Sequence, residues 1–375
     1  MKTIKDLDIN NKRVIIRFDY NVPIKDGVIL DDTRIVKSLK TLNYARKCAS
    51  KVIILSHLGR IKTIDDKEKN SLRVVCDHLS ELINEKVAFS TYDDAKEVIE
   101  NNDIIMMENT RFFDLDNNKE SNNDLELSKY FASFGDVFIN DAFGVSHRSN
   151  ASNVGISSIL PSCNGYLMEE EVNNLELLVK DVKRPYTVIM GGSKVSDKIK
   201  LIDNIIDKVD YLLIGGGMVY TFLKSIGKTI GNSICEDEYL DYSKELLDKY
   251  KKKIILIEDN FINLNDNVSI DDMKNSDKGL DIGINTVSNF KKYIDKSKTV
   301  FFNGPLGLFE EGYEYGTKEI LDSLNKSSAT VVIGGGDTVN AVNKLLPENN
   351  FIISTGGGAS LEYLEGKKLP GIIEE

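Results

Sequence analysis

Short runs of apolar residues recur along the whole chain without alternating with polar residues. They are four to six residues long and rich in valine and isoleucine. The runs occupy 13–18, 51–55, 103–107 and 136–139 in the first half, and 186–190, 211–214, 253–257, 299–302, 330–333 and 350–353 in the second. Such runs are typical of strands buried on both faces of a parallel sheet.

Longer amphipathic stretches separate these runs, such as 72–83 and 237–250. Strands that alternate with helices predict β/α units, which assemble into parallel sheets through right-handed connections. The stretch 168–180 also has a helical pattern, and it lies where the chemistry of the loops changes. We therefore place the junction between two domains there.

Polar and cationic residues follow the predicted strands of the first half. Ligand-binding loops lie at the carboxyl ends of the strands in open parallel sheets. Six residues that are cationic or can become so lie at or near these ends: Arg34, His57, Arg60, Arg111, His147 and Arg148. Any one of them alone would be read as a capping or surface residue. Together they indicate a site for a small polyanion that bears phosphate and carboxylate.

Glycines follow most predicted strands of the second half. They cluster after the runs that end near 190, 214, 302, 333 and 354. A glycine loop between a strand and a helix exposes backbone amides at the positive end of the helix dipole, where a phosphate binds, although glycine also serves tight turns. Asp337 follows one glycine triplet and is suited to Mg²⁺, to capping a helix, or to both.

The overall charge excludes some classes of partner. The chain has 48 Lys and Arg against 59 Asp and Glu, a net charge of −11. A globally acidic protein is not expected to bind nucleic acid or a membrane surface. The N-terminus has no apolar signal segment, and the four cysteines form no metal-ligand or disulfide pattern. These features predict a cytoplasmic protein with reduced thiols.

Two familiar nucleotide motifs are absent. The residues 227–229 resemble the end of a P-loop, but the motif requires glycine where the chain has Phe222. The third glycine of the dinucleotide fingerprint is likewise missing from all three glycine triplets, where Tyr220, Val339 and Leu361 stand instead. A standard NAD site is therefore not expected.

Taken in order, nine segments resemble phosphoglycerate kinases. They are RFDYNVP at 17–23, SHLGR at 56–60, ENTRF at 108–112, NDAFGVSHR at 140–148, GGSKVSDKI at 191–199, LDIG at 280–283, NGPLGLFE at 303–310, GGGDT at 334–338 and STGGGASLEYLEGK at 354–367. The chain departs from the usual pattern at Ile61 and Asn285, where the family usually has proline, and at Asn150, where it usually has histidine.

The resemblance implies an α/β fold of two doubly wound, Rossmann-like domains joined by a helix and hinge. The phosphoglycerate domain would span 1–165, the helix and hinge 166–182 and the Mg-nucleotide domain 183–362, with 363–375 folding back onto the first domain. The implied reaction is reversible phosphoryl transfer from 1,3-bisphosphoglycerate to ADP, giving 3-phosphoglycerate and ATP, with Mg²⁺, by a monomer.

The resemblance also assigns residues. Asp19, Asn21, Arg34, His57, Arg60, Arg111, His147 and Arg148 would bind the phosphoglycerate. The nucleotide and its metal would be bound by Lys194, Lys198, Gly215, Gly216, Gly283, Glu310, Gly335, Gly336, Asp337 and Thr338, with Asp337 on Mg²⁺. Gly357 and Gly358 would offer amides to the transferred group.

The chemistry of the residues is compatible with this reaction. Phosphoryl transfer depends on positioning and charge stabilisation, and the attacking carboxylate or phosphate is already an anion. No general base is then needed, and we expect Arg34 and Lys198 to stabilise the transition state. The alternatives are a different nucleotide-dependent phosphotransferase and a two-domain binding protein without activity. The second predicts a secretion signal and no paired Lys194 and Lys198 beside glycine loops, and the sequence contradicts both expectations. A 3-phosphoglycerate-dependent release of ADP from ATP would separate them.

Overall fold

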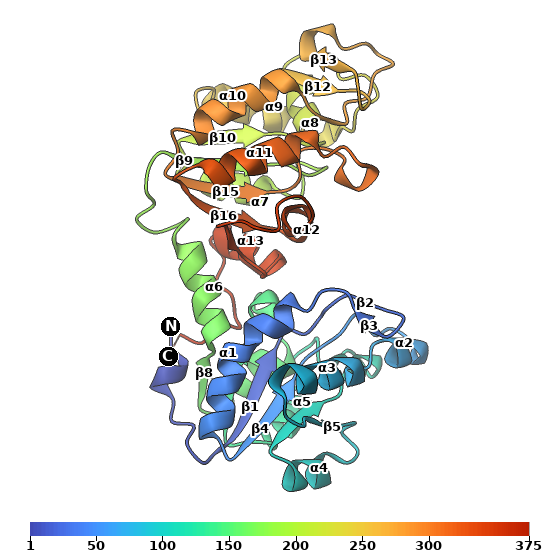
Figure 1. The fold of residues 1–375 in the computed structure, drawn as a ribbon, viewed down its shortest axis with the longest axis vertical. Helices are drawn as coiled ribbons and strands as arrows, with labels where there is room; N and C mark the ends of the chain where they lie inside the picture. The colour runs from blue at the N-terminus through green and yellow to red at the C-terminus, as the bar shows by residue number, and fades with distance from the viewer. Residues whose placement is uncertain (375) are drawn as a thin grey trace. The chain divides into compact units, whose positions relative to one another are not determined.

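The computed structural model describes residues 1–374, which form two compact units (Figure 1). Unit 1 contains residues 1–173 and the C-terminal segment from Lys368, and unit 2 spans Asn174–Lys367. The division falls inside helix α6 (Tyr166–Glu176). The domain boundaries given above stay a prediction.

Unit 1 is built on a six-stranded sheet in which every neighbouring pair of strands is parallel. In spatial order the strands are β5 (Ala88–Ser90), β6 (Ile104–Met107), β4 (Lys51–Leu55), β1 (Arg13–Phe18), β7 (Val137–Asp141) and β8 (Ser162–Asn164). The chain begins in the middle, at β1, and builds outward first to one side and then to the other. This is the doubly wound arrangement.

The non-alternating apolar pattern of the strands has a direct cause in this sheet. Val14 and Ile16 of β1 pack into one hydrophobic cluster, and Ile15 between them packs into a second cluster. Successive side chains of a strand point to opposite faces, so both faces of the sheet are covered. Burial of both faces therefore favours apolar residues at consecutive positions, and Arg17 is the one buried charged residue of β1.

Helices and short elements complete unit 1. The helices are α1 (Thr33–Cys48), α2 (Ile64–Lys69), α3 (Arg73–Ile83), α4 (Ala95–Asn101), α5 (Leu125–Ala132) and the first part of α6; a small hairpin is formed by β2 (Ile24–Lys25) and β3 (Val28–Ile29). The short helical turns are η1 (Ile4–Asp6), η2 (Thr110–Leu115), η3 (Phe143–Val145) and η4 (Ala151–Gly155).

The C-terminal segment is part of unit 1. The Lys2 amide donates to the Ile373 carbonyl at 3.0 Å, and the Gly371 amide donates to the Ser146 carbonyl at 2.8 Å. Figure 1 accordingly shows the two ends of the chain close together. The segment also reaches the strand β7, because the Asn140 side chain donates to the Gly371 carbonyl at 2.7 Å.

Unit 2 repeats the plan with a second parallel sheet. Its strands are, in spatial order, β11 (Ile254–Ile255), β10 (Tyr211–Ile214), β9 (Tyr186–Met190), β15 (Thr299–Asn303), β16 (Thr330–Gly334) and β17 (Ile352–Ile353). A small antiparallel sheet contains β13 (Asn267–Ser269), β12 (Asp259–Phe261) and β14 (Asp281–Ile282).

The helices of unit 2 connect these strands. They are α7 (Ile199–Ile205), α8 (Val219–Ser225), α9 (Leu240–Lys249), α10 (Ile284–Ile294), α11 (Tyr315–Lys326), α12 (Gly336–Leu345) and α13 (Gly358–Leu364), with short turns η5 (Asp237–Tyr239), η6 (Ile270–Asp272) and η7 (Phe309–Glu311). The predicted fold class, two doubly wound α/β units, is confirmed.

Within the two parallel sheets, the differences from the predicted elements lie at the edges. The strands expected at 253–257 and 350–353 shrink to two residues each, and the strands β5 and β8 were not predicted. Both β5 and β8 are three residues long, and their sequences, Ala-Phe-Ser and Ser-Cys-Asn, contain no valine or isoleucine. An edge strand pairs on one side only, so its sequence carries a weaker pattern.

Candidate active-site residues in the two units

The site of unit 1 lies at the carboxyl ends of the central strands. Asp19 directly follows β1 and His57 closely follows β4, its neighbour in the sheet. Arg34 is the second residue of α1. These positions bring three of the predicted residues to one edge of the sheet, next to β1, where the strand order reverses and ligands are expected.

A hydrogen-bonded group joins three of the predicted site residues, Asp19, Asn21 and Arg34, to the backbone of Gly59. Arg34 Nη1 lies 2.9 Å from Asp19 Oδ2 and donates to the Asn21 carbonyl at 3.2 Å. The Gly59 amide donates to Asn21 Oδ1 at 2.9 Å. The Asp19 carboxylate thus orients a guanidinium that is only partly exposed, and the loop after β4 is tied to the loop after β1.

Arg111 and Arg148 belong to the same cationic cluster. Arg111 Nη1 donates to the Gly59 carbonyl, and Arg148 Nε donates to His147 Nε2 at 3.1 Å. Burial and then the charges of Arg148 and Arg17 lower the pKa of Arg111, so these guanidinium groups influence one another. Arg60 is exposed beside Gly59. Several unneutralised cations held close together form a binding site for a polyanion.

His57 is enclosed by this cluster. Its side chain is buried, and its Nδ1 lies 3.3 Å from Arg17 Nη2 and 3.9 Å from Asp19 Oδ1. Burial lowers the pKa of His57 well below its ordinary value, and the neighbouring arginines lower it further. His57 is therefore a neutral imidazole at neutral pH, and it offers hydrogen bonds rather than charge.

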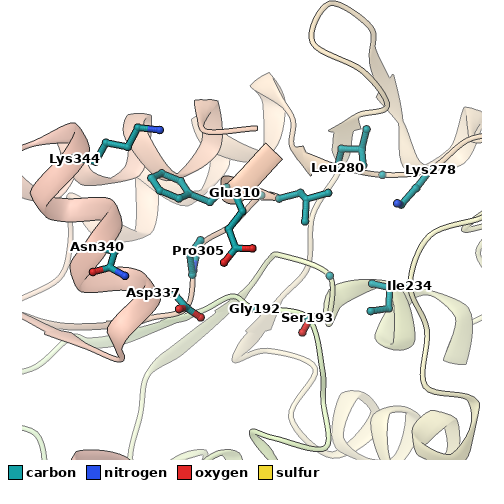
Figure 2. Close-up of a pocket in the computed structure, with 15 residues that line it drawn as sticks. Gly192, Ser193, Ile234, Lys278, Leu280, Pro305, Glu310, Asp337, Asn340 and Lys344 are labelled. Carbon is teal, nitrogen blue, oxygen red and sulfur yellow. The ribbon is translucent and has the colours of Figure 1, made fainter. Parts of the chain in front are cut away.

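The site of unit 2 is a cavity of about 650 Å³ at the corresponding reversal of strand order, next to β9 and β15. Figure 2 shows Asp337 and Glu310 nearer one end and Ile234, Leu280 and Lys278 at the other. The remaining lining residues come mostly from the loops that follow these strands: Gly192, Ser193, Gly217, Gly279, Pro305, Gly307, Leu308, Phe309, Asn340 and Lys344.

The amino end of α12 contributes to this cavity. Asp337 is the second residue of the helix, so the cap expected there is wrong: the capping residue is Gly335, at φ +88°. A side chain at Gly335 would be strained by that φ and would come 2.7 Å from Asn303 Nδ2. With glycine at position 335, the backbone amides at the start of α12 stay accessible to a ligand. Thr338 is buried and its hydroxyl accepts the Gly304 amide at 2.7 Å.

Lys198 lies at the start of α7 and bonds to the strand β15. Its Nζ donates to Asn303 Oδ1. Burial lowers the pKa of Lys198, whereas the carboxylates of Asp197 and Asp337 raise it, so Asp337 lies within electrostatic reach. Lys194 is exposed. Gly357 caps α13 at φ +53° and Gly358 is the first residue of that helix.

Three glycines that were expected to contact the adenine base do not line the cavity. A side chain at Gly215 would meet Leu306 and Ile282, and one at Gly216 would meet the backbone of Gly192. Gly283 caps α10 against Asp259. Each glycine permits a close approach within the protein, and its contact with the base stays a prediction.

Some residues of both sites were not predicted from the sequence. Asn340 and Lys344 line the cavity, and their helical spacing after Asp337 is a signal that would have found them. Arg17 is the charged residue inside the otherwise apolar interior of β1, and that position alone marked it as unusual. Ile234 and Lys278 come from loops with no recognisable pattern.

Comparison with known proteins decides the family. The sequence model of phosphoglycerate kinase matches residues 4–367. The chain belongs to the phosphoglycerate kinase family. Membership confirms the predicted enzyme class and activity, a kinase that transfers a phosphoryl group between phosphoglycerate and a nucleotide.

Relatives and solved structures in the phosphoglycerate kinase family match along almost the whole chain. The chain is 46% identical over 388 residues to a phosphoglycerate kinase of Enterococcus faecalis and 47% over 390 residues to one of Fusobacterium nucleatum, covering 99% of this chain and 98% of each relative. The phosphoglycerate kinase structure from Coxiella burnetii matches with a TM-score of 0.87 at 36% identity, covering 99% of this chain and 97% of that one. That from Pyrococcus horikoshii matches with a TM-score of 0.84 at 27% identity and the same coverage.

One departure from the usual phosphoglycerate kinase pattern has a structural consequence. The Asn285 amide donates to Asp259 Oδ2 at 2.9 Å. Proline has no amide hydrogen, so a proline at position 285 could not make this bond. The start of α10 is therefore held by a hydrogen bond. Asn150 is buried and caps η4.

A magnesium site made of protein side chains alone is not seen. Among residues 1–374 no group of three or more His, Cys, Asp or Glu side chains is arranged to hold a metal ion. Asp337 offers one carboxylate at the cavity, which fits a Mg²⁺ that takes its other ligands from nucleotide phosphates and water. Over the same residues, no helix is long and apolar enough to cross a bilayer.

Proposed function

We propose that unit 1 binds the phosphoglycerate and unit 2 binds the nucleotide with Mg²⁺. The observation that carries this assignment is the difference between the two sheet edges. Arg34, Arg111 and Arg148 gather in unit 1, whereas unit 2 has a large cavity beside the amino end of a helix. Arginines suit a compact polyanion, and the cavity suits a ligand with a flat apolar part and a phosphate tail.

The cavity has a direction that matches a nucleotide. Asp337, at the start of α12, marks the end where backbone amides would receive the phosphates. The apolar side chains of Ile234 and Leu280 would contact the base at the other end. Glu310 projects between them and would accept hydrogen bonds from the ribose hydroxyls.

Magnesium would be held by Asp337 and the phosphate oxygens. When bound, it neutralises charge on the phosphates. Lys198 would supply a second positive charge: burial lowers its pKa, while the carboxylates of Asp197 and Asp337 favour the charged form. Lys194 would contact the outer phosphates. Gly335, Gly336 and Thr338 would cradle them, and Gly357 and Gly358 would present amides to the group in transfer.

The transfer itself needs no nucleophile from the protein. The phosphoglycerate carboxylate attacks the terminal phosphorus of ATP in one direction, and the ADP phosphate attacks the acyl phosphate in the other. Arg34 and Lys198 stabilise the charge on the transferred group. The acyl phosphate hydrolyses in water, so the reaction requires exclusion of solvent.

The assignment is tested by separating the two binding functions. Isothermal titration with 3-phosphoglycerate and with Mg-ADP is carried out on Arg111→Gln and Asp337→Asn. We expect the first variant to lose 3-phosphoglycerate binding and keep Mg-ADP, and the second to do the reverse. Loss of both ligands from either folded variant would contradict the assignment. A coupled assay with ATP, Mg²⁺ and 3-phosphoglycerate tests the overall reaction and excludes another phosphotransferase.

We also propose a monomeric protein of the cytoplasm whose units move about a hinge. The free thiols of Cys48, Cys76, Cys163 and Cys235 suit a reducing compartment. Light scattering after size exclusion measures the mass in solution, and a value near 42.0 kDa is expected.

A further inference from the structure

A buried chain of polar groups lies behind the cationic site of unit 1. It begins at Glu120, whose Oε2 accepts the Ser152 amide at 3.0 Å and whose Oε1 accepts the Ser152 hydroxyl. Ser152 Oγ in turn accepts Arg17 Nε at 2.8 Å. Arg17 then reaches His57 Nδ1 through Nη2 at 3.3 Å and the Phe18 carbonyl through Nη1.

None of these side chains is free to move into solvent. The exposed fractions are 1% for Glu120, 2% for Arg17 and 3% for His57. Burial raises the pKa of Glu120 and lowers that of Arg17, and each of the two charges opposes the change in the other. The two side chains are thus buried groups of opposite charge, bridged by Ser152, and each favours the ionised form of the other.

The donor chemistry of Arg17 fixes the state of His57. A guanidinium has only N–H donors, so the His57 Nδ1 that it faces must be the acceptor. The ring is then neutral and its proton sits on Nε2. No residue of the described chain is bonded to that Nε2, which leaves the Nε2–H available to an anion.

The charged groups around His57 all favour this state except one. Those that face it are Arg17 from β1, Arg34 from α1, Arg111 from η2, Arg148 after η3 and the carboxylate of Asp19 after β1. Asp19 Oδ1 is 3.9 Å from Nδ1, farther than the guanidinium of Arg17. Four cations against one anion keep a second proton off the ring.

We propose that Glu120 and Ser152 are positioning residues, which hold Arg17 so that His57 presents a fixed Nε2–H donor to the anionic substrate. The inference rests on the function proposed above, in which His57 belongs to the phosphoglycerate site. It adds that His57 binds as a neutral donor and that its tautomer is set by Glu120 and Ser152, which act through Arg17.

The direct test is nitrogen NMR of the full-length protein labelled with ¹⁵N-histidine. The chain has three histidines, and the His57 signals are identified by their loss in His57→Gln. We expect an unprotonated Nδ1 and a protonated Nε2 from pH 6 to pH 8, without titration. A His57 that carries a proton on Nδ1, or titrates in this range, would overturn the proposal before any ligand is added.

Ser152→Ala removes the bridge and leaves both charged groups. We expect its His57 signals to show mixed tautomers, the KM for 3-phosphoglycerate to rise about tenfold, and kcat to stay within about twofold. Ser128→Ala is the matched control, because it deletes another buried hydroxyl of unit 1. The Ser128 hydroxyl donates to the Asp124 carbonyl and is not bonded to Glu120, Ser152, Arg17 or His57. Unchanged His57 signals in Ser152→Ala would contradict the proposed relay.

Glu120→Gln gives a second measurement. The amide oxygen can still accept from Ser152, but the negative charge opposite Arg17 is lost, so the same changes are expected. If Glu120→Gln does not fold, Ser152→Ala alone decides. A failure of the proposed function is distinguishable, because wild-type protein that binds no 3-phosphoglycerate would still report the His57 tautomer by NMR.

Discussion

At the scale of single residues, the environment of a cation determines what it can do. Arg34 is paired with Asp19 on one side and is partly exposed, so it can reach a ligand. Arg17 is as charged as Arg34 but is buried, and its donors are used within the protein. The position of Arg34 near a predicted strand end was enough to propose it as a substrate-binding residue, and that role stays a prediction. The role of Arg17 needed Glu120 and Ser152, which are 103 and 135 residues away.

Lys198 offers a test at this scale. Lys198→Ala is expected to lower kcat by several tens-fold or more, because the charge that faces the transferred group is lost, while the fold survives. Steady-state kinetics measure kcat, and circular dichroism shows whether the fold survives. Lys200→Ala is the control, since it removes an exposed lysine of the same helix. A Lys198→Ala enzyme with near-normal kcat would contradict the assignment.

Buried carboxylates make stability depend on pH. Burial raises the pKa of Asp141 to about 7 from the ordinary value of 3.8, although its Oδ1 accepts the Met168 amide at 3.0 Å. The folded protein then holds a proton that the unfolded chain has released, so this contribution to stability is lost as pH rises from about 4 through about 7.

The corresponding prediction compares urea unfolding midpoints at pH 5 and pH 8. The midpoint of the wild type is expected to fall more over this range than that of Asp141→Asn, which has no proton to lose. Asp103→Asn, at an exposed site, should behave as the wild type does. Equal pH dependence in Asp141→Asn and wild type would show that the carboxyl is ionised in the folded state at pH 5.

At the scale of elements, the central strands were predictable and the edges were not. A strand such as β1, with neighbours on both sides and both faces covered, is apolar at nearly every buried position, and Arg17 is the exception. The antiparallel strands β12, β13 and β14 are short and polar, with sequences such as Asp-Asn-Phe, so no hydrophobic pattern marks them. The cavity wall that starts at Lys278 runs into β14, and no strand pattern marked Lys278 and Gly279.

The C-terminal segment packs against the loop of unit 1 that carries His147 and Arg148, which are proposed to bind the phosphoglycerate. A side chain at Gly371 would come 2.8 Å from the Ser146 Cα, directly before His147 and Arg148. Gly371→Ala must therefore shift the segment or the loop. We expect the KM for 3-phosphoglycerate to rise several-fold and the Kd for Mg-ADP, measured by titration, to stay unchanged. Lys368→Ala, an exposed change in the same segment, is the control. An unchanged KM would mean that the loop does not depend on this contact.

At the scale of the whole molecule, the global charge and the site charges have different meanings. The chain carries a net charge of −11, yet its substrates are polyanions. The arginines of unit 1 and the helix ends of unit 2 provide local positive potential against that background. Arginine is absent after Arg184, so unit 2 relies on lysine, backbone amides and Mg²⁺ for its proposed phosphate contacts.

The last prediction concerns what happens when both substrates bind. Each proposed site lies in a different unit, and the reaction requires the two ligands to meet out of contact with water. Either ligand alone supplies contacts to one unit only, so it has little differential affinity for a closed form. Small-angle X-ray scattering should therefore show a smaller radius of gyration only with 3-phosphoglycerate and a Mg-nucleotide together. Arg111→Gln, given both ligands, should fail to compact because it cannot retain the first. Equal compaction with either ligand alone would contradict this coupling and indicate that closure depends on one site.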